Sequence, residues 1–229
     1  ALARSRPPEE RWSILVNEVG MVDVDGAVLG ASPEAVGMRV DTLPGGCICC
    51  TSQAPFMEAV AEALRVTHPH RLFVEPTGLA SPGPLIEALA EGPLAGVTEV
   101  GAVITLVDPR RFLEPAMRAH PVFAEQVAVA DILVGNRADL ATEAQLTAFL
   151  AEGRALTPPK RVVATCVQGA LSLDWLDAPV GERPLVQREE GHGHHAHGHG
   201  HDREPAPMAP APDADGIVRW AHAGSLAST

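Results

Sequence analysis

The sequence predicts an α/β protein built on a mostly parallel β-sheet with helices on both faces. Short apolar, β-branched segments recur along the 229 residues, and segments rich in Ala, Leu and Glu with helical periodicity lie between them. This alternation favours right-handed βαβ units, which form parallel sheets that bind ligands at the carboxyl ends of their strands. The apolar content of 46% is enough for a substantial core.

The predicted strands are five short apolar runs. They are WSILV at 12–16, RLFV at 71–74, GAVITLV at 101–107, DILVG at 131–135 and RVVAT at 161–165. The stretches between them that place apolar residues three and four positions apart are predicted to be helices. They are APFMEAVAEALRV at 54–66, PLIEALAEG at 84–92 and ATEAQLTAFLAEG at 141–153.

The composition changes after residue 177, which we take as the end of the first domain, residues 1–177. Residues 178–215 are rich in Pro, Gly and His and lack apolar periodicity, so they are predicted to be a disordered linker. The run GIVRW at 216–220 is strand-like. We expect residues 216–229 to begin a C-terminal domain that this chain does not complete.

Charge and hydropathy exclude several kinds of partner. The sequence has 29 acidic and 17 basic side chains, a balance that repels phosphate backbones, so nucleic acid is not expected as a partner. No apolar run approaches the roughly 20 residues that cross a bilayer, and the N-terminus lacks the apolar block of a signal peptide. We therefore expect a cytoplasmic protein without membrane contact, in which clustered cysteines more often bind metal or carry redox chemistry than form structural disulfides.

The segment LPGGCICC at 43–50 carries three of the four cysteines. Cys47, Cys49 and Cys50 cannot all pair, and a disulfide between the adjacent Cys49 and Cys50 would be strained. As thiolates all three can bind Zn²⁺, which leaves a fourth tetrahedral position for water, a side chain or an acceptor. The alternative is that they are buried as small hydrophobic residues, which is the role we expect for Cys166.

A histidine-rich run, GHGHHAHGHGHD, lies within the predicted linker. Most of its imidazoles are neutral at pH 7 and suit Zn, Ni, Co and Cu, so the run is interpreted as a metal-collecting loop with several weak sites. An inert polar tether is the alternative. The histidines are His192, His194, His195, His197, His199 and His201.

Polar residues that directly follow predicted strands are the candidates for ligand binding. In the run DILVGNRADL the predicted strand ends at Asn136, and Asp139 follows three residues later. A carboxylate there can accept two parallel hydrogen bonds from guanine, and an Asn on the same turn can meet the base and tie neighbouring loops together. A capped turn without a ligand is the alternative.

The strand RLFV is followed by Glu75 and then Gly78. A carboxylate in this position can hold a magnesium-bound water or orient an attacking water, and a glycine lets backbone N–H groups approach a terminal phosphate. A Glu that caps the following turn is the alternative. The loop after the first predicted strand carries Asp23 and Asp25, which fit either a nucleotide-responsive switch or a solvated acidic turn.

Taken in order, the motifs NEVG, GGCICC, EPTGLASP, LVDP and NRADL resemble the CobW-like family of P-loop GTPase metallochaperones, the CobW/HypB/UreG nucleotide-binding domain. The resemblance covers roughly residues 12–165. It implies a P-loop NTPase-like fold and a GTPase whose nucleotide state controls the capture or release of zinc, cobalt or nickel for a client metalloprotein, with GTP and Mg²⁺ as cofactors. The implied site residues are Asn136, Arg137 and Asp139 at guanine, Glu75 as the catalytic carboxylate, Gly78 at the γ-phosphate, Asp25 in a switch region, and Cys47, Cys49 and Cys50 at the metal.

The sequence departs from the family pattern at three places. The phosphate-binding loop GxxGxGKT occurs nowhere in it, so we expect the first strand and this loop to be missing and the chain as given not to hydrolyse GTP. Arg137 stands where the family usually has lysine, and its broader planar head packs differently beside a base. Met21 stands where the family often has a carboxylate.

The function expected from these residues is that of a GTP-dependent metal chaperone, of the zinc or cobalt class, represented by a fragment. Two alternatives stay open. A non-enzymatic metal buffer would use the CICC segment and the histidines without nucleotide, and a pseudo-GTPase would use the guanine pocket only to bind a partner.

Overall fold

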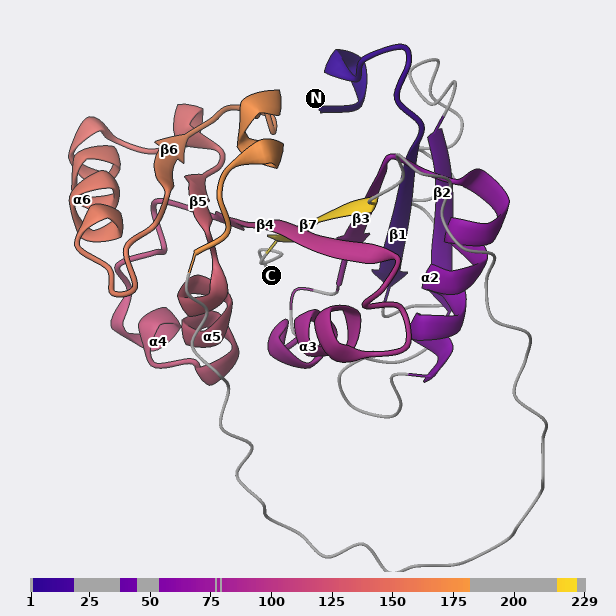
Figure 1. Ribbon diagram of the computed structural model, residues 1–229. Helices are drawn as coiled ribbons and strands as arrows, with labels where there is room; N and C mark the ends of the chain where they lie inside the picture. The colour runs from indigo at the N-terminus through magenta and orange to yellow at the C-terminus, as the bar shows by residue number, and fades with distance from the viewer. Residues whose placement is uncertain are drawn as a thin grey trace, which may run out of the picture.

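A computed structural model describes residues 2–18, 38–44, 54–76, 78, 80–181 and 218–225 (Figure 1). The strands are β1 (Trp12–Glu18), β2 (Met38–Pro44), β3 (Arg71–Glu75), β4 (Thr98–Val107), β5 (Ile132–Gly135), β6 (Val162–Thr165) and β7 (Val218–Ser225). The α-helices are α2 (Ala54–Thr67), α3 (Gly83–Glu91), α4 (Pro115–Arg118), α5 (Pro121–Val129) and α6 (Glu143–Arg154). The 3-10 turns are η1 (Leu2–Ser5), η3 (Ala138–Leu140) and η4 (Leu173–Asp177).

The strands form one seven-stranded sheet in the order β2-β1-β3-β7-β4-β5-β6, and every pair in it is parallel. The predicted α/β class with a parallel sheet is therefore confirmed. All five predicted strands and all three predicted helices are present, with ends that differ by a few residues. Strand β2 and helix α5 were not predicted from the sequence.

The helices of the described residues cover the two faces of the sheet unequally. On one face α2 and α3 enclose Leu15 and Val103 in a core, and α5 and α6 continue the same layer over Leu133. On the other face the cover consists of the short turns η1 and η4, which pack over Trp12 and Ile104. Among the described residues the α-helices therefore cover one face of the sheet, whereas the sequence led us to expect helices on both, and the other face carries 3-10 turns.

Strand β7 lies in the interior of the sheet (Figure 1). Its backbone pairs with β3 from Arg71 to Val74 and with β4 from Thr98 to Leu106. The sequence led us to expect a missing strand in the sheet and a separate domain beginning at residue 216. The structure instead fills the position between β3 and β4 with residues 218–225, which satisfies backbone groups that two open strand edges would leave unpaired. The domain boundaries of a longer protein stay a prediction.

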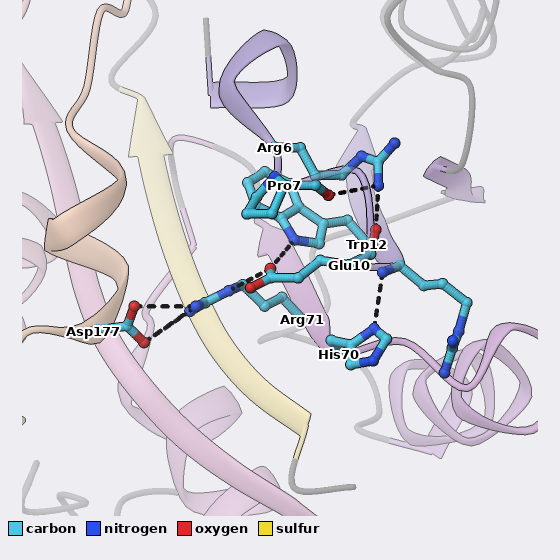
Figure 2. A network of polar contacts seen from close by, with 8 residues as sticks. Arg6, Pro7, Glu10, Trp12, His70, Arg71 and Asp177 are labelled. Carbon is cyan, nitrogen blue, oxygen red and sulfur yellow. Dashed lines mark hydrogen bonds and ion pairs between the residues drawn. The ribbon is translucent and has the colours of Figure 1, made fainter. Parts of the chain in front are cut away.

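An ion-pair network ties the N-terminal segment to the amino ends of β1 and β3 (Figure 2). Arg71 lies between two carboxylates, at 2.9 Å from Glu10 and 3.1 Å from Asp177 of η4. The indole of Trp12 also donates to Glu10, at 2.6 Å. Burial alone would raise the pKa of the Glu10 carboxyl, but hydrogen bonds from Trp12 and Arg71 lower that pKa below its ordinary value.

Replacing Arg71 by methionine is expected to lower the free energy of unfolding by about 2 kcal/mol, because Glu10 loses a charged hydrogen bond in a half-buried place. Since the pKa of Glu10 is lowered in the fold, its contribution is present above its unfolded pKa and is lost as the pH falls through the folded value. The loss on acidification should therefore be smaller in Arg71→Met than in the wild type. Urea titrations over a pH series measure both effects.

Arg65 provides the matched control. It pairs with Glu62 at 2.7 Å on the surface of α2, where both side chains are about half exposed. Arg65→Met should change the stability by less than about 0.5 kcal/mol. Equal effects of the two substitutions would contradict a stabilising role for the Arg71 network.

Candidate functional site

The residues that follow the predicted strands lie along one edge of the sheet, because parallel strands end on the same side. Glu75 is the last residue of β3, and Asp108, Asn136 and Cys166 directly follow β4, β5 and β6. Backbone hydrogen bonds hold these ends in register, from Asn136 N–H to the Val107 carbonyl at 2.8 Å and from Cys166 N–H to the Gly135 carbonyl at 2.8 Å. In parallel α/β sheets this carboxyl edge is where ligands bind.

The side chain of Asn136 connects the loop after β5 with the loop after β6. Its carbonyl oxygen accepts a hydrogen bond from the backbone N–H of Gly169 at 3.3 Å and from the thiol of Cys166 at 3.4 Å. The backbone carbonyl of Cys166 in turn accepts from the N–H of Ala138 at 3.1 Å. Asn136 thus ties neighbouring loops together, the structural half of the role expected for it.

Arg137 and Asp139 lie on the turn that follows. Arg137 has φ 58° and ψ 38°, the left-handed region that non-glycine residues rarely adopt. Asp139 lies exposed in η3, and Thr142 then begins α6 with a side chain that accepts from the N–H of Gln145. A strained backbone between two hydrogen-bonded elements is typical of a binding loop whose geometry is fixed by its surroundings.

An ion pair that the sequence analysis did not single out stands beside this loop. Arg110 donates from Nε and Nη2 to both carboxylate oxygens of Asp108, at 2.9 Å and 2.5 Å. These hydrogen bonds hold the pKa of Asp108 below its ordinary value, and the charge of Arg137 acts in the same direction. The LVDP motif contains Asp108, but no pattern in the sequence predicted that Arg110, two residues later, would pair with it.

Cys166 is buried, as expected for a core residue, and it also borders the site. It belongs to the cluster that includes Ile132 and Val134. Burial raises the pKa of its thiol above the ordinary value. A protonated thiol that donates to Asn136 is a structural group rather than a metal ligand.

Side chains of α5 form hydrogen bonds with the loop that carries Gly78. Gln126, whose side chain is 2% exposed, donates from Nε2 to the backbone carbonyls of Gly78 and Ala80, at 3.1 Å and 3.0 Å. The neighbouring Glu125 carboxylate accepts from the hydroxyl of Ser81 at 2.5 Å and from the N–H of Gly83 at 3.1 Å. The two side chains therefore hold Gly78, Ala80, Ser81 and Gly83 in place.

Replacing Gln126 by leucine or by glutamate is expected to lower the free energy of unfolding by roughly 1–3 kcal/mol, because either change removes the donor and leaves two carbonyls unsatisfied. Glutamate keeps the shape of the side chain, so it separates the hydrogen bonds from packing. Limited proteolysis should show faster cleavage within residues 78–83 in both variants. A Gln126→Glu protein with wild-type stability and cleavage would contradict the assigned contacts.

Several predicted site residues lie outside the described residues. Among the residues that the structure describes, no group of three or more His, Cys, Asp or Glu side chains is placed to hold a metal ion. Strand β2 ends at Pro44, three residues before the cysteine segment, so the chain enters that segment from the carboxyl edge of the sheet. The residues outside are Asp25, Cys47, Cys49, Cys50, His192, His194, His195, His197, His199 and His201.

The strand order sets the separation between the two predicted sites. Five strand-to-strand steps lead from β2, before the cysteines, to β5, before Asn136, or about 24 Å at about 4.8 Å per step. Strand β3, which ends at Glu75, lies two steps from β2. The loop after β3 is therefore closer to the start of the cysteine segment than the loop after β5 is.

No helix in the described part of the chain is long and apolar enough to span a membrane.

The parallel sheet with its polar carboxyl edge defines an α/β protein of the kind that binds ligands at the ends of its strands. Residues 1–164 match the family model described as CobW/HypB/UreG, nucleotide-binding domain. The chain belongs to this family, as its motifs led us to expect.

Similar proteins include two that are named zinc chaperones. Over 141 residues the chain is 36% identical to the zinc chaperone YeiR of Escherichia coli K12, an alignment that covers 62% of this chain and 42% of YeiR. Over 190 residues it is 30% identical to the zinc chaperone CobW of Pseudomonas aeruginosa, covering 71% of this chain and 51% of that protein. The chain thus spans about half the length of the curated relatives it matches.

A solved structure supports the fold. A crystal structure of a Zn(II)-bound triple mutant of the YjiA GTPase superposes with a TM-score of 0.51 at 23% sequence identity, covering 76% of this chain and 55% of the other. At this identity the likeness concerns the fold alone.

Proposed function

We propose that this chain is the nucleotide-responsive part of a GTP-dependent zinc chaperone. The observation that carries the proposal is the loop arrangement at Asn136, whose side chain joins the loops after β5 and β6 next to the exposed Asp139. Family membership and the zinc-chaperone names of YeiR and CobW support the same function.

In this proposal the turn after β5 reads the base. Asp139 accepts hydrogen bonds from the ring N–H and the exocyclic amine of guanine, a donor pair that adenine does not offer. Asn136 meets the other edge of the base while holding Gly169 in place. Arg137 packs its aliphatic stem beside the ring system, with its charge near that of Asp108.

The loop after β3 responds to the terminal phosphate. The Glu75 carboxylate is a hard oxygen ligand suited to a magnesium-bound water, and Mg²⁺, when bound, neutralises phosphate charge. The backbone at Gly78 approaches the γ-phosphate, and Gln126 holds the other side of that backbone in position. Asp25 belongs to a second switch segment.

The cargo is a transition metal, with zinc as the leading candidate and cobalt or nickel as alternatives. Thiolates of Cys47, Cys49 and Cys50 bind it and leave one coordination position for an acceptor, because a carrier must release what it binds. The histidine run at 192–201 collects metal in weaker sites. A client metalloprotein receives the ion.

The nucleotide state controls release of the metal through the loop after β3, which is nearer to the cysteines than the base-binding loop after β5 is. GTP binding draws the loop after β3 against the terminal phosphate, and this loop lies two strands from β2 and the cysteine segment. Hydrolysis releases that loop and changes the geometry of the thiolates, so that the metal passes to the acceptor.

Exchanging Asp139 for asparagine tests guanine recognition. The protein is this chain carrying a GxxGxGKT segment of the family at its N-terminus, and the measurement is the Kd of a fluorescent GTP analogue. Asparagine replaces one acceptor by a donor and removes the charge, so one charged hydrogen bond is lost, the other becomes neutral, and the Kd should rise roughly 100-fold or more. Binding of the xanthosine analogue should improve, since xanthine offers an acceptor where guanine has its amine.

Glu143→Gln is the control, because it removes a negative charge at the start of α6 without removing an acceptor for the base. Its Kd for the GTP analogue should stay within about twofold of the wild type. If Asp139→Asn bound the GTP analogue as tightly as this control, the proposed guanine site would be wrong. The unextended chain should bind the analogue negligibly.

A further inference from the structure

A cavity of about 190 Å³ lies between α5, α6 and the segment that leads into β6. Its walls are mainly apolar, and three charged side chains stand around it. The lining includes Phe112, Phe123, Val127, Leu156, Arg118, Glu152 and Lys160. Lys160 precedes β6 and Ala128 precedes β5, so the lysine side of the cavity is near the amino ends of these strands, away from the edge that carries Asn136.

Lys160 is the single lysine among the 17 basic residues of the sequence. Its side chain is half-buried, and Nζ donates to the backbone carbonyl of Ala128 at 2.8 Å. That carbonyl lies in the last turn of α5, where backbone acceptors have no partner within the helix. One of the three N–H donors of the amine is used in this hydrogen bond, which fixes the amine at the wall of the cavity.

The charges around Lys160 are few and divided in sign. Arg118 and Glu152 form an ion pair of 3.6 Å on the cavity lining, with both side chains about half exposed. Asp131 is the acidic residue whose charge acts on Lys160 and favours its protonated form. Burial favours the neutral amine, outweighs the effect of Asp131, and lowers the pKa of Lys160 from its ordinary 10.5 to about 8.

We propose that Lys160 is an acylation site, at which the amine takes a short acyl group from an activated acyl donor seated in this cavity. The donor class is an acyl thioester or an acyl phosphate. The nitrogen lone pair attacks the carbonyl carbon and a C–N bond forms. The bond to sulfur or to the phosphate oxygen breaks, the thiolate or phosphate leaves with the electron pair, and the amine proton passes to water.

Three features make this lysine suited to the reaction. The amine is held at a fixed point by the Ala128 carbonyl, which reduces the orientation entropy of the attack. The cavity is of a size for a short acyl chain, and its aromatic and aliphatic walls favour the apolar part of that chain. With a pKa of about 8 instead of 10.5, the neutral, nucleophilic fraction at pH 7 is about 300 times that of an ordinary lysine.

Acylation also changes the interaction of Lys160 with the C-terminal end of α5. The amide that forms keeps one N–H for the Ala128 carbonyl but loses the positive charge at the C-terminal end of this helix, where a cation is favourable. The same helix carries Glu125 and Gln126, which fix the backbone around Gly78. The modified residue and that loop are thus joined by one rigid element.

The test treats the whole chain separately with acetyl phosphate and with the acetyl thioester of a small thiol, over a pH series. Intact mass and peptide mapping follow the acetyl group, after hydroxylamine has removed acetyl groups from cysteines. We expect Lys160 to react half-maximally near pH 8 and, at pH 7, at least about tenfold faster than a free lysine derivative. Acylation by one donor alone supports the proposal and identifies the source.

Two variants complete the test. Lys160→Arg keeps the charge and should remove the lysine label, leaving only the N-terminal amine. Ala124→Leu fills part of the cavity from the exposed side of α5 and should slow acylation at least about threefold while the pH midpoint stays near 8. The proposal is overturned if neither donor labels Lys160 faster than free lysine, or if Ala124→Leu leaves the rate unchanged.

Discussion

Replacing Cys47, Cys49 and Cys50 together by alanine is expected to abolish tight zinc binding. Loss of a group that merely supports a metal ligand already weakens affinity by about 10- to 100-fold, and here three direct thiolate ligands disappear. The Kd for zinc, measured by competition with a chelator of known affinity, should therefore rise by more than about 1,000-fold. Cobalt-loaded protein should lose its sulfur-to-metal charge-transfer absorption at the same time.

Cys166→Ala is the matched control, because this cysteine is buried among Ile132 and Val134 and donates to Asn136. It should keep both the tight zinc ion and the cobalt spectrum. Replacing the six histidines at 192–201 should lower the number of weakly bound ions and spare the tight one. Unchanged zinc affinity in the triple cysteine variant would refute thiolate ligation, and with it the carrier function.

Gly135→Ala is expected to lower both the stability of the fold and the binding of nucleotide. A Cβ at this position would lie 2.7 Å from the Pro109 ring and 2.8 Å from the ring of Phe149. Phe149 is fully buried and packs edge-on against Phe112 at 5.1 Å, so the ring has little space to move. Overpacking of this kind costs about 1–3 kcal/mol, or several degrees in Tm for a chain of this size.

Because Asn136 directly follows Gly135, the same change should displace the loop that we assign to guanine. The extended protein should therefore lose affinity for the GTP analogue as well as stability. Gly96→Ala is the control, since no atom lies within 4 Å of its added Cβ. Its Tm should stay close to that of the wild type. Equal melting temperatures for the two alanine variants would show that the packing around Gly135 is looser than described.

The sequence predicted the elements whose signal is local. The runs WSILV and GAVITLV are apolar enough to indicate interior strands from composition alone, and both have a neighbouring strand on each side. Strand β2 was missed because Arg39 and Asp41 interrupt its apolar pattern. These two pair at 2.6 Å on a strand at the edge of the sheet, where partly exposed positions tolerate charge.

The site was predictable to the extent that its residues directly follow strands. Asn136 and Asp139 could be found from their position after DILVG. Gln126 could not, because its partners Gly78 and Ala80 lie 48 and 46 residues earlier in the chain. Helix α5 was itself missed: it begins at a proline, is rich in valine, and turns this glutamine toward the core, which obscures a helical apolar stripe.

The position of β7 has a consequence for folding. Arg71 pairs with Arg219 across 148 residues of sequence (219 − 71), and Thr98 pairs with Val218 across 120 (218 − 98). Contacts of such long range form slowly. While β7 is unpaired, the facing borders of β3 and β4 can pair with strands of other chains, so the refolding yield of this chain should fall as the protein concentration rises.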